Sequence, residues 1–544
     1  MRHTRLRIEG MTCATCASTV EQALDAVAQG RVRVDFASGL AEVEHSETVT
    51  DDRLRAAVTA AGFSARVLAD DAEAGTGDDG QDLHIAIVGS GSGAFAAALR
   101  ASERGARVSL IEQGTLGGTC VNIGCVPSKI LIRAAHIAWL SGHHAIDGLE
   151  RHQPALDNAA RLRQQRARVE ELRQAKYRAV LEANPAIELI AGRAAFEDAH
   201  TLRVALNAGG EQRIRADRIL LATGARPAVP DIPGLDETPF WTSTEALETE
   251  RLPRHLLVLG ASVVALELAQ AYHHLGVEVT LLARGRLLSR EEPELGEALT
   301  ALLRRQGMRV LLDCPVTAVH HANDMFHLHT PQGELTGDAL LVATGRRPNT
   351  DALALDRAGV ATDPGGHIMV DEHLRTSQPH VFAVGDCTQQ PQFVYVAAAA
   401  GTRAGINMTG GEARLDLSVV PRVIFTQPQV AAVGLGEAEA REQGLAVASR
   451  ILEMDQVPRA LANFDTEGFI KLVAEEGSGR LLGAHLFCDQ AGEVVQTAAL
   501  AIRQGLTVTQ LAEQLFPYLT WVEGLKLTAQ TFARDVSQLS CCAG

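Results

Sequence analysis

The sequence predicts an α/β protein with two open, doubly wound parallel sheets, a small βαββαβ ferredoxin-like module before them and an α+β domain after them. Residues 83–112 and 256–284 each read as a buried strand, a glycine-containing turn, a helix and a second strand, which predicts the two sheets. The strand and helix pattern of residues 4–68 predicts the module. A chain of 544 residues is also too long for one compact core.

Composition narrows the classes of partner. The formal net charge of -16 disfavours nucleic acids and anionic membranes, which require a basic surface. No apolar stretch approaches the roughly 18 residues that span a bilayer, and the first nine residues are charged, unlike a signal peptide. We therefore expect a cytoplasmic protein without membrane insertion or nucleic-acid binding.

Nine cysteines include three closely spaced pairs, at positions 13/16, 120/125 and 541/542. In a reducing compartment such pairs indicate metal binding or redox catalysis, and structural disulfides are the weaker interpretation. The first pair lies on the loop GMTCATC, which enters a helix of the N-terminal module. Residues 69–82 follow the module and are small and acidic, so they predict a flexible tether.

The first glycine turn predicts a dinucleotide site. Gly89, Gly91 and Gly93 let the backbone turn tightly and approach a pyrophosphate at a helix N-terminus, with Ala94 in the strict third position. Glu112 ends the second strand, where a carboxylate accepts a hydrogen bond from a ribose hydroxyl. A single degenerate match could be a plain tight loop, but two matches in a strand–helix–strand context favour nucleotides.

The second turn differs in the groups that select the cofactor. Gly260 and Ser262 replace the two leading glycines, and the second strand runs into Arg284 instead of an acid. Because an arginine pairs with a 2′-phosphate that a carboxylate would repel, this turn favours NADPH over NADH, with Arg286 or Arg290 as additional cations.

The segment GGTCVNIGCVPSK, residues 117–129, places Cys120 and Cys125 at a predicted helix start, where Pro127 suits an early helical position. A helix N-terminus stabilises a thiolate, and two such thiols can pass on two electrons as a disulfide/dithiol couple. A zinc half-site or a buried pair are the alternatives, although no second close Cys/His pair accompanies the segment.

Residues 82–544 resemble the pyridine nucleotide-disulphide oxidoreductases. The resemblance rests on the dithiol segment and on LLATGARP, LLVATGRRPN and VFAVGDC. It implies bound FAD, with Asp386 near the ribityl or phosphate region and Lys129 paired with Glu267 near the flavin ring. Cys125 would be the charge-transfer thiol and Cys120 the thiol that exchanges with substrate. The expected cofactor contacts are completed by Gly114, Thr119, Ala194, Val394 and Gly345.

The C-terminal sequence separates substrate classes within that family. Disulfide-reducing members carry an HPTxxE-like motif, whereas this chain reads YLTWVE, with Tyr518 in place of the histidine and Glu523 retained. A phenol with a pKa of about 10 is a poor proton shuttle at neutral pH, so disulfide reduction should be impaired. Cys541 and Cys542 then form a terminal thiol pair that suits a soft, two-coordinate ion, or else an uninformative pair.

Cys13 and Cys16 lie in a loop similar to that of heavy-metal-associated domains, which binds copper or zinc in other proteins. Together the features resemble the mercury-reducing members of the family. The resemblance implies a relay of thiol pairs for Hg(II), a homodimer in which one subunit's tail serves the other's dithiol, and hand-over from a mercury transporter. It also implies that Tyr177 and Tyr518 flank the metal path.

The expected function is NADPH-dependent reduction of Hg(II) to Hg(0) through FAD and the dithiol. A disulfide reductase with a fused metal module is disfavoured by Tyr518, and a metallochaperone with vestigial flavin domains by Lys129, Glu267 and Asp386. The expected domains are a heavy-metal-associated domain (1–69), a linker (70–81), an FAD-binding domain in two parts (82–229 and 350–417), an NADPH-binding domain (230–349) and a dimerisation domain with the Cys-Cys tail (418–544).

Overall fold

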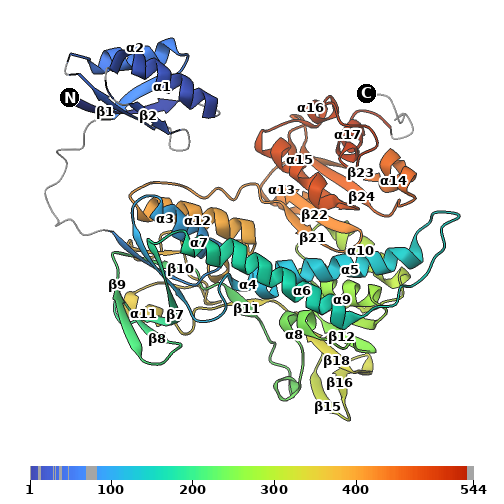
Figure 1. Ribbon diagram of the computed structural model, residues 1–544. Helices are drawn as coiled ribbons and strands as arrows, with labels where there is room; N and C mark the ends of the chain where they lie inside the picture. Colours follow the sequence, from blue (N-terminus) through green and yellow to red (C-terminus); the bar gives the residue numbers. More distant parts are fainter. Residues whose placement is uncertain are drawn as a thin grey trace. The chain divides into compact units, whose positions relative to one another are not determined.

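The computed structural model describes residues 2–9, 14–28, 30, 32–35, 40–46, 48–68 and 83–535. The chain forms two compact units, Met1–Gln81 and Asp82–Gly544, which we describe separately (Figure 1). Several expected features lie outside the described residues: Cys13, the side chain of Cys16, the tether, Cys541 and Cys542.

The N-terminal unit has the predicted βαββαβ order. Its antiparallel sheet runs β2-β3-β1-β4. The elements are β1 (Arg2–Glu9), α1 (Ala14–Ala28), β2 (Val32–Asp35), β3 (Leu40–His45), α2 (Asp51–Ala60) and β4 (Ser64–Leu68). Leu6, Leu24 and Leu54 are fully buried, so strand and helices share one small core.

The first α/β domain of the larger unit contains the sheet β20-β10-β5-β6-β7-β8-β9. Its strands are β5 (His84–Val88), β6 (Arg107–Glu112), β7 (Ile187–Phe196), β8 (Thr201–Leu206), β9 (Glu211–Arg215), β10 (Arg218–Leu221) and β20 (Val381–Ala383). The strands from β20 to β7 are parallel, whereas β7, β8 and β9 form an antiparallel extension. Because β20 pairs with β10, the domain is built from two separate stretches of chain.

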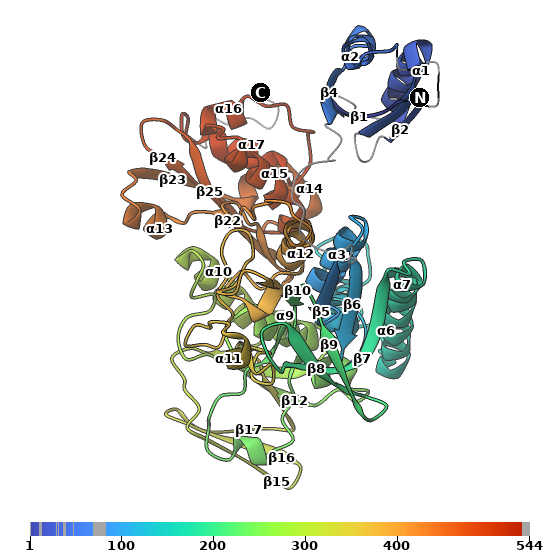
Figure 2. The ribbon, with the colours of Figure 1, turned by 90° about the vertical axis from the view of Figure 1, so that its left-hand side faces the viewer.

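Helices α3 (Ser92–Ser102) and α12 (Val394–Met408) lie side by side over this sheet (Figures 1 and 2). Their backbones approach so closely that a Cβ on Gly401 would lie 2.0 Å from the Gly93 carbonyl oxygen. A Cβ on Gly405 would lie 2.9 Å from the carbonyl oxygen of Ala97. Glycine at these positions therefore brings the late segment of the domain against the early one.

The remaining helices of this domain include the two that carry the predicted dithiol, α4 and α5. They are α4 (Gly118–Ile123), α5 (Cys125–His143), α6 (Asn158–Arg173), the π-helical turn η1 (Gln174–Arg178), α7 (Ala179–Glu182) and α11 (Leu355–Ala358), with the 3-10 turn η3 (Gly385–Cys387). On α6, the buried Gln165 donates to the Leu247 carbonyl at 2.9 Å and accepts from Arg161 at 2.7 Å. The bond to Leu247 connects α6 to the second α/β domain, and the bond from Arg161 orients the Gln165 amide.

The second α/β domain contains the parallel sheet β14-β13-β12-β18. Its elements are η2 (Leu235–Glu237), α8 (Ser243–Glu248), β12 (His255–Leu259), α9 (Val263–His274), β13 (Glu278–Leu282), α10 (Pro293–Arg305), β14 (Arg309–Leu311) and β18 (Ala339–Val342). An antiparallel sheet of β15 (Ala318–Ala322), β16 (Met325–Thr330) and β17 (Gly333–Gly337) packs on it. The chain enters this domain through β11 (Ala225–Pro227) and leaves it through β19 (Arg346–Pro348), and the two strands pair in an antiparallel ribbon.

The C-terminal domain is α+β, as predicted. Its antiparallel sheet has the order β21-β22-β25-β24-β23, with helices α15 and α17 packed on it. Its elements are β21 (Arg422–Ile424), β22 (Gln429–Gly434), α13 (Glu437–Glu442), β23 (Val447–Glu453), η4 (Met454–Gln456), α14 (Pro458–Asn463), β24 (Phe469–Glu475), β25 (Leu481–Cys488), α15 (Ala491–Arg503), α16 (Val508–Ala512) and α17 (Glu523–Gln530).

A buried ammonium joins the second α/β domain to the C-terminal domain. Lys471 Nζ lies 2.6 Å from carboxylate oxygens of both Glu292 and Glu294 and 2.8 Å from Glu437. Burial opposes ionisation of Glu437, but hydrogen bonds from Lys471 and Ser449 outweigh it and lower the pKa of this carboxyl to about 2. The three carboxylates could hold a metal ion by their spacing, but the lysine already neutralises part of their charge.

Among the described residues, one helical stretch, Gly118–His143, is by length and composition apolar enough to cross a membrane, although no such stretch was expected from the sequence. A single stretch is weak evidence for a membrane span, because core helices satisfy the same criterion. This stretch comprises α4 and α5, and its residues Leu131 and Ala135 are buried in a core shared with α9.

The close approach of α3 and α12 predicts that Gly401→Ala destabilises the protein. Alanine has the higher helix propensity by about 1 kcal/mol, but its Cβ would meet Gly93 backbone, and overpacking of this kind costs about 1–3 kcal/mol. We expect a lower melting temperature in calorimetry for Gly401→Ala and an unchanged one for Thr402→Ala, its neighbour on α12. Equal melting temperatures for the two variants would show that the helices separate without cost.

Candidate functional site

The predicted dithiol lies at the junction of α4 and α5. Cys120 is in α4, Cys125 is the first residue of α5, and both thiols are free. Gly124 separates the helices, and a Cβ there would lie 2.9 Å from the Thr119 carbonyl oxygen. The glycine therefore lets the chain turn sharply enough to place one thiol at the N-terminus of a 19-residue helix.

The two thiols have opposite tendencies to ionise. The hydrogen bond from Cys120 lowers the pKa of Cys125 to about 7, against the effect of burial and with help from the Lys129 ammonium. The same hydrogen bond, together with burial, raises the pKa of Cys120. At neutral pH the pair therefore holds one proton on Cys120 and a large fraction of thiolate on Cys125.

Lys129 lies one helical turn after Cys125, and its partner comes from the other α/β domain. Its Nζ is 2.7 Å from Glu267 Oε2, where Glu267 belongs to α9 and is only 5% exposed. The second carboxylate oxygen accepts from the backbone N–H of Phe425 at 2.9 Å, and the Lys129 ammonium lies 4.5 Å from the centre of the Phe425 ring. The sequence predicted the ion pair but not the contacts of Phe425, because Phe425 belongs to none of the recognised motifs.

Tyr177 lies beside the dithiol within the same chain. It belongs to the π-helical turn η1, and its ring packs edge-on against Phe95 at 4.7 Å between centres. A Cβ on Gly117 would lie 3.4 Å from the Tyr177 ring, which places the ring next to the dithiol segment. Burial raises the pKa of the phenol, and the nearby cysteines act in the same direction. Tyr177 therefore stays protonated and can donate a hydrogen bond towards a thiolate.

The first glycine turn fits a pyrophosphate. Gly89 has φ +106°, and a Cβ there would lie 2.3 Å from the Ala222 carbonyl oxygen. Gly91 caps the N-terminus of α3, and nothing lies within 4 Å of where its Cβ would be. Glu112 accepts from the Ser90 hydroxyl and from the Gly114 N–H, each at 2.6 Å, which fixes its carboxylate at the end of β6.

The other residues expected to contact FAD differ in their exposure to solvent. Asp386 lies 3.5 Å from Arg346 and is desolvated, which raises the pKa of its carboxyl against the effect of the arginine. Thr119 and Val394 are exposed, at α4 and at the start of α12. Ala94 and Ala194, in contrast, are buried.

The second glycine turn has the same construction. Gly260 has φ +148°, a Cβ there would lie 2.3 Å from the Ala343 carbonyl oxygen, and Ser262 caps α9. Arg284 is exposed just after β13 and, within residues 83–535, has no hydrogen bond or ion pair. Arg286 instead donates to the carbonyls of Ser289 and Glu291, so it is committed to its own loop.

Gly345 lies in the turn before β19, with φ +139° and nothing within 4 Å of where its Cβ would be. The open space at this turn is compatible with the expected role of Gly345 in cofactor binding.

Tyr518 belongs to the C-terminal domain, just before α17, and is 51% exposed. Figure 1 shows α17 in that domain, whereas α4 lies within the first α/β domain. Glu523 accepts from the Leu519 N–H at 3.1 Å, and burial raises the pKa of its carboxyl. The retained glutamate therefore orders the loop that presents Tyr518.

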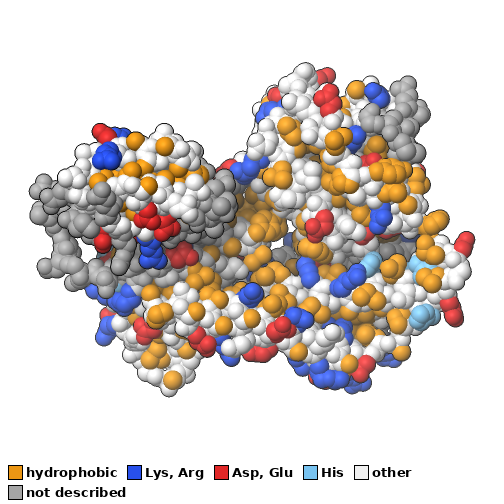
Figure 3. Space-filling view, turned by 45° about the horizontal axis from the view of Figure 1, so that its top comes forward, with side chains coloured by type: hydrophobic (Ala, Val, Ile, Leu, Met, Phe, Trp, Pro, Cys, Tyr) orange, Lys and Arg blue, Asp and Glu red, His pale blue; other side chains and the backbone are white. Residues whose placement is uncertain are grey.

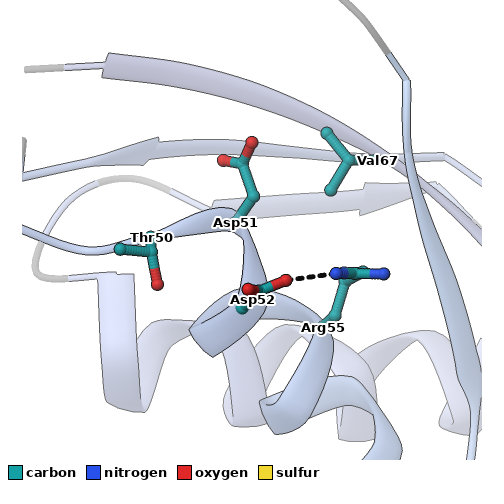
Figure 4. A pocket seen from close by; sticks show the side chains of 5 residues that line it. All are labelled: Thr50, Asp51, Asp52, Arg55 and Val67. Atoms are coloured by element: carbon teal, nitrogen blue, oxygen red, sulfur yellow. Dashed lines mark hydrogen bonds and ion pairs between the residues drawn. The ribbon is translucent and has the colours of Figure 1, made fainter.

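A concave surface on the N-terminal unit is unrelated to these thiols. It is lined by Thr50, Asp51, Asp52, Arg55 and Val67, and Asp52 pairs with Arg55 within it (Figure 4). It offers no sulfur or imidazole ligand among these side chains, so it has no features of a soft-metal site.

Family comparisons cover most of the chain. Residues 83–401 match the pyridine nucleotide-disulphide oxidoreductase family, and residues 420–529 match the dimerisation domain of that family. Residues 5–64 match the heavy-metal-associated domain. Solved relatives include the HOCl-induced flavoprotein disulfide reductase RclA of Escherichia coli, with TM-score 0.74 and 31% identity over 82% of this chain and 99% of that one. Another is LpdA of Mycobacterium tuberculosis, with TM-score 0.75 and 26% identity over 83% of this chain and 100% of that one.

Similarity to curated proteins extends over the full length. The mercuric reductase of Acidithiobacillus ferrooxidans is 56% identical over 99% of both chains. The mercuric reductase of Shigella flexneri is 55% identical over 99% of this chain and 100% of its own. The chain therefore belongs to the pyridine nucleotide-disulphide oxidoreductase family and, within that family, to the mercuric reductases.

Proposed function

We propose that the protein catalyses NADPH-dependent reduction of Hg(II) to Hg(0). The observation that carries the proposal is the dithiol, in which Cys125 has a pKa of about 7 and Cys120 keeps its proton. Full-length identity of 56% to a mercuric reductase supports the choice of substrate. Replacement of the expected histidine by Tyr518 further disfavours disulfide substrates.

The two glycine turns fit FAD and NADPH. Gly89, Gly91 and Glu112 would hold FAD, and Gly260 and Arg284 would hold NADPH, with the arginine at the 2′-phosphate. When bound, the cofactors supply two electrons and one proton per NADPH, Hg(II) takes both electrons and leaves as the neutral atom, and the proton is released. Lys129, beside Cys125, would lie near the flavin ring.

The residues of the chain bring the ion to the cofactor and hold it there. Cys120 and Cys125 exchange with the thiolates that carry Hg(II), because soft thiolate ligands favour soft cations. Tyr177, held protonated by burial beside the dithiol, donates to a thiolate along the metal path. We assign Tyr518 the same role from the partner subunit, and Glu523 positions its loop.

The outer thiols and the assembly form the rest of the proposal. Two outer thiol pairs, Cys13 with Cys16 and Cys541 with Cys542, would receive Hg(II) from a mercury transporter and pass it to the dithiol. The protein would act in the cytoplasm as a homodimer, in which the C-terminal tail of one subunit serves the dithiol of the other. The chain carries the dimerisation domain. Exposed apolar side chains there support an interface, among them Leu500 and Leu515, the latter 97% exposed, and Figure 3 shows apolar side chains gathered on this domain.

The domain assignments are part of the same proposal. The larger unit would comprise an FAD-binding domain in two parts, an NADPH-binding domain and a dimerisation domain, with boundaries near residues 229, 349 and 417.

The function is tested by following NADPH oxidation with mercuric chloride and excess small thiol, together with release of mercury vapour. We expect Cys120→Ala to lower this turnover by more than about 100-fold, because the ion loses one of its two thiolates. Cys314→Ala, which removes a buried thiol of the second α/β domain, serves as the control, with equal flavin content in both variants. Turnover with a disulfide but none with Hg(II) would refute the proposed function.

Lys129→Gln is expected to raise the pKa of Cys125 from about 7 by about one unit, because the ammonium stabilises the thiolate. The thiolate fraction at pH 7 then falls from about half to about one tenth. The rate of Cys125 alkylation by iodoacetamide across pH, followed by peptide mass spectrometry, measures this shift. Arg133→Gln, one turn further along α5, should leave the profile unchanged; an equal shift in both variants would contradict the assignment to Lys129.

Deletion of residues 1–68 should leave turnover with thiol-bound Hg(II) largely unchanged, because these residues belong to a separate compact unit. The deletion variant and the full chain are compared at equal flavin content. Loss of most activity would show that the N-terminal module is required for catalysis in this assay.

A further inference from the structure

The outer sheet of the second α/β domain carries a cluster of metal-ligating side chains that the proposed reaction does not use. Strands β15, β16 and β17 bury one face against the domain core. The buried side chains are Val319, Phe326, Leu328 and Leu335. Because side chains alternate along a strand, the opposite face projects outward, and it carries His320, His327, His329 and Glu334.

The register of the sheet brings these four residues together. His320 pairs with His327 across β15 and β16, and His329 pairs with Glu334 across β16 and β17. The His320 and His327 rings stack 4.5 Å apart at an angle of 7°, and the His320 and His329 ring centres are 5.7 Å apart. A His-x-His pair on one strand therefore faces a third histidine on the next.

Glu334 orients the His327 ring through a hydrogen bond and lies near the His329 ring. Its Oε1 lies 2.9 Å from His327 Nδ1, and its Oε2 lies 3.8 Å from His329 Nδ1. A carboxylate accepts a hydrogen bond from N–H, so this contact places the proton on His327 Nδ1 and leaves Nε2 with its lone pair. Within residues 83–535, the Nε2 atoms of the three rings have no hydrogen-bond partner.

We propose that His320, His327 and His329 bind a divalent cation of borderline softness, such as Zn²⁺, and that Glu334 is the outer carboxylate that positions His327. Three imidazoles with a carboxylate on the remote nitrogen form a recurrent zinc-binding arrangement. The rings are stacked in this structure, so binding requires rotation about their χ angles. His320 is exposed, and the side chains of His329 and His327 are 49% and 25% exposed, which leaves space for that rotation. Nitrogen ligands would make this site chemically distinct from the thiol pairs.

The test uses the full-length, flavin-loaded protein with its thiols blocked by N-ethylmaleimide, so that sulfur ligands do not contribute. Equilibrium dialysis against Zn²⁺ at pH 7.5, with bound metal measured by atomic emission, gives stoichiometry and affinity. We expect the parent protein to bind one equivalent of Zn²⁺ that the variant His327→Gln/His329→Gln lacks. Glu334→Gln should weaken this binding by about 10–100-fold, since only the orienting carboxylate is lost.

The matched control is His321→Gln, because His321 belongs to the same hairpin but packs against Phe326 at 4.7 Å between ring centres. This variant should bind Zn²⁺ like the parent protein. Before the thiols are blocked, circular dichroism, flavin content and NADPH oxidation with Hg(II) should be equal in all four proteins, since none of the substituted residues belongs to the redox site. Equal Zn²⁺ binding curves for the parent protein and the double histidine variant, including no binding by either, would overturn the proposal.

Discussion

The ion pair between Lys129 and the buried Glu267 is the constraint on which the larger unit depends. Lys129 extends from the helix that begins at Cys125, Glu267 lies on a helix of the second α/β domain, and Phe425, at the end of β21, supplies the N–H for the other carboxylate oxygen. One carboxylate thus ties three domains together. Because a buried charge without its partner is costly, the three segments are held in the arrangement that also sets the charge beside the dithiol.

Glycine serves two purposes in the first α/β domain. Gly93 and Gly401 allow α12, from the late part of the chain, to pack directly on α3. Gly89 and Gly91 open the turn before α3, where a Cβ would meet backbone in one case and open space in the other. The segment from Gly89 to Gly93 therefore allows α12 to pack on α3 and also leaves space for a pyrophosphate at the N-terminus of α3. A substitution that moved this N-terminus would affect both the packing of the two helices and the pyrophosphate site.

The parts of the fold that could be predicted from sequence are those set by local spacing, such as the glycine turns and the βαββαβ order. The parts that could not be predicted arise from contacts between distant segments. Lys471 reads as an ordinary strand residue, yet it is buried against Glu292, 179 residues away. The histidines of β15 and β16 look unrelated until the strand register pairs them. For Tyr518, the sequence suggested the proposed chemistry, but in this structure the residue belongs to the C-terminal domain, and in the proposed homodimer it would approach the dithiol of the other subunit.

The unequal protonation of the dithiol explains why a tyrosine can replace the general acid of disulfide-reducing relatives. Cleaving a disulfide releases a thiolate that needs a proton from a nearby acid. In the proposed exchange, the Cys120 thiol replaces the first thiolate on Hg(II) and gives its own proton to the departing sulfur. The Cys125 thiolate then replaces the second thiolate without transferring a proton, so bonds and protons balance within the pair. Because the acid is the ligand itself, a separate histidine has no step to perform, and a hydroxyl such as Tyr518 suffices.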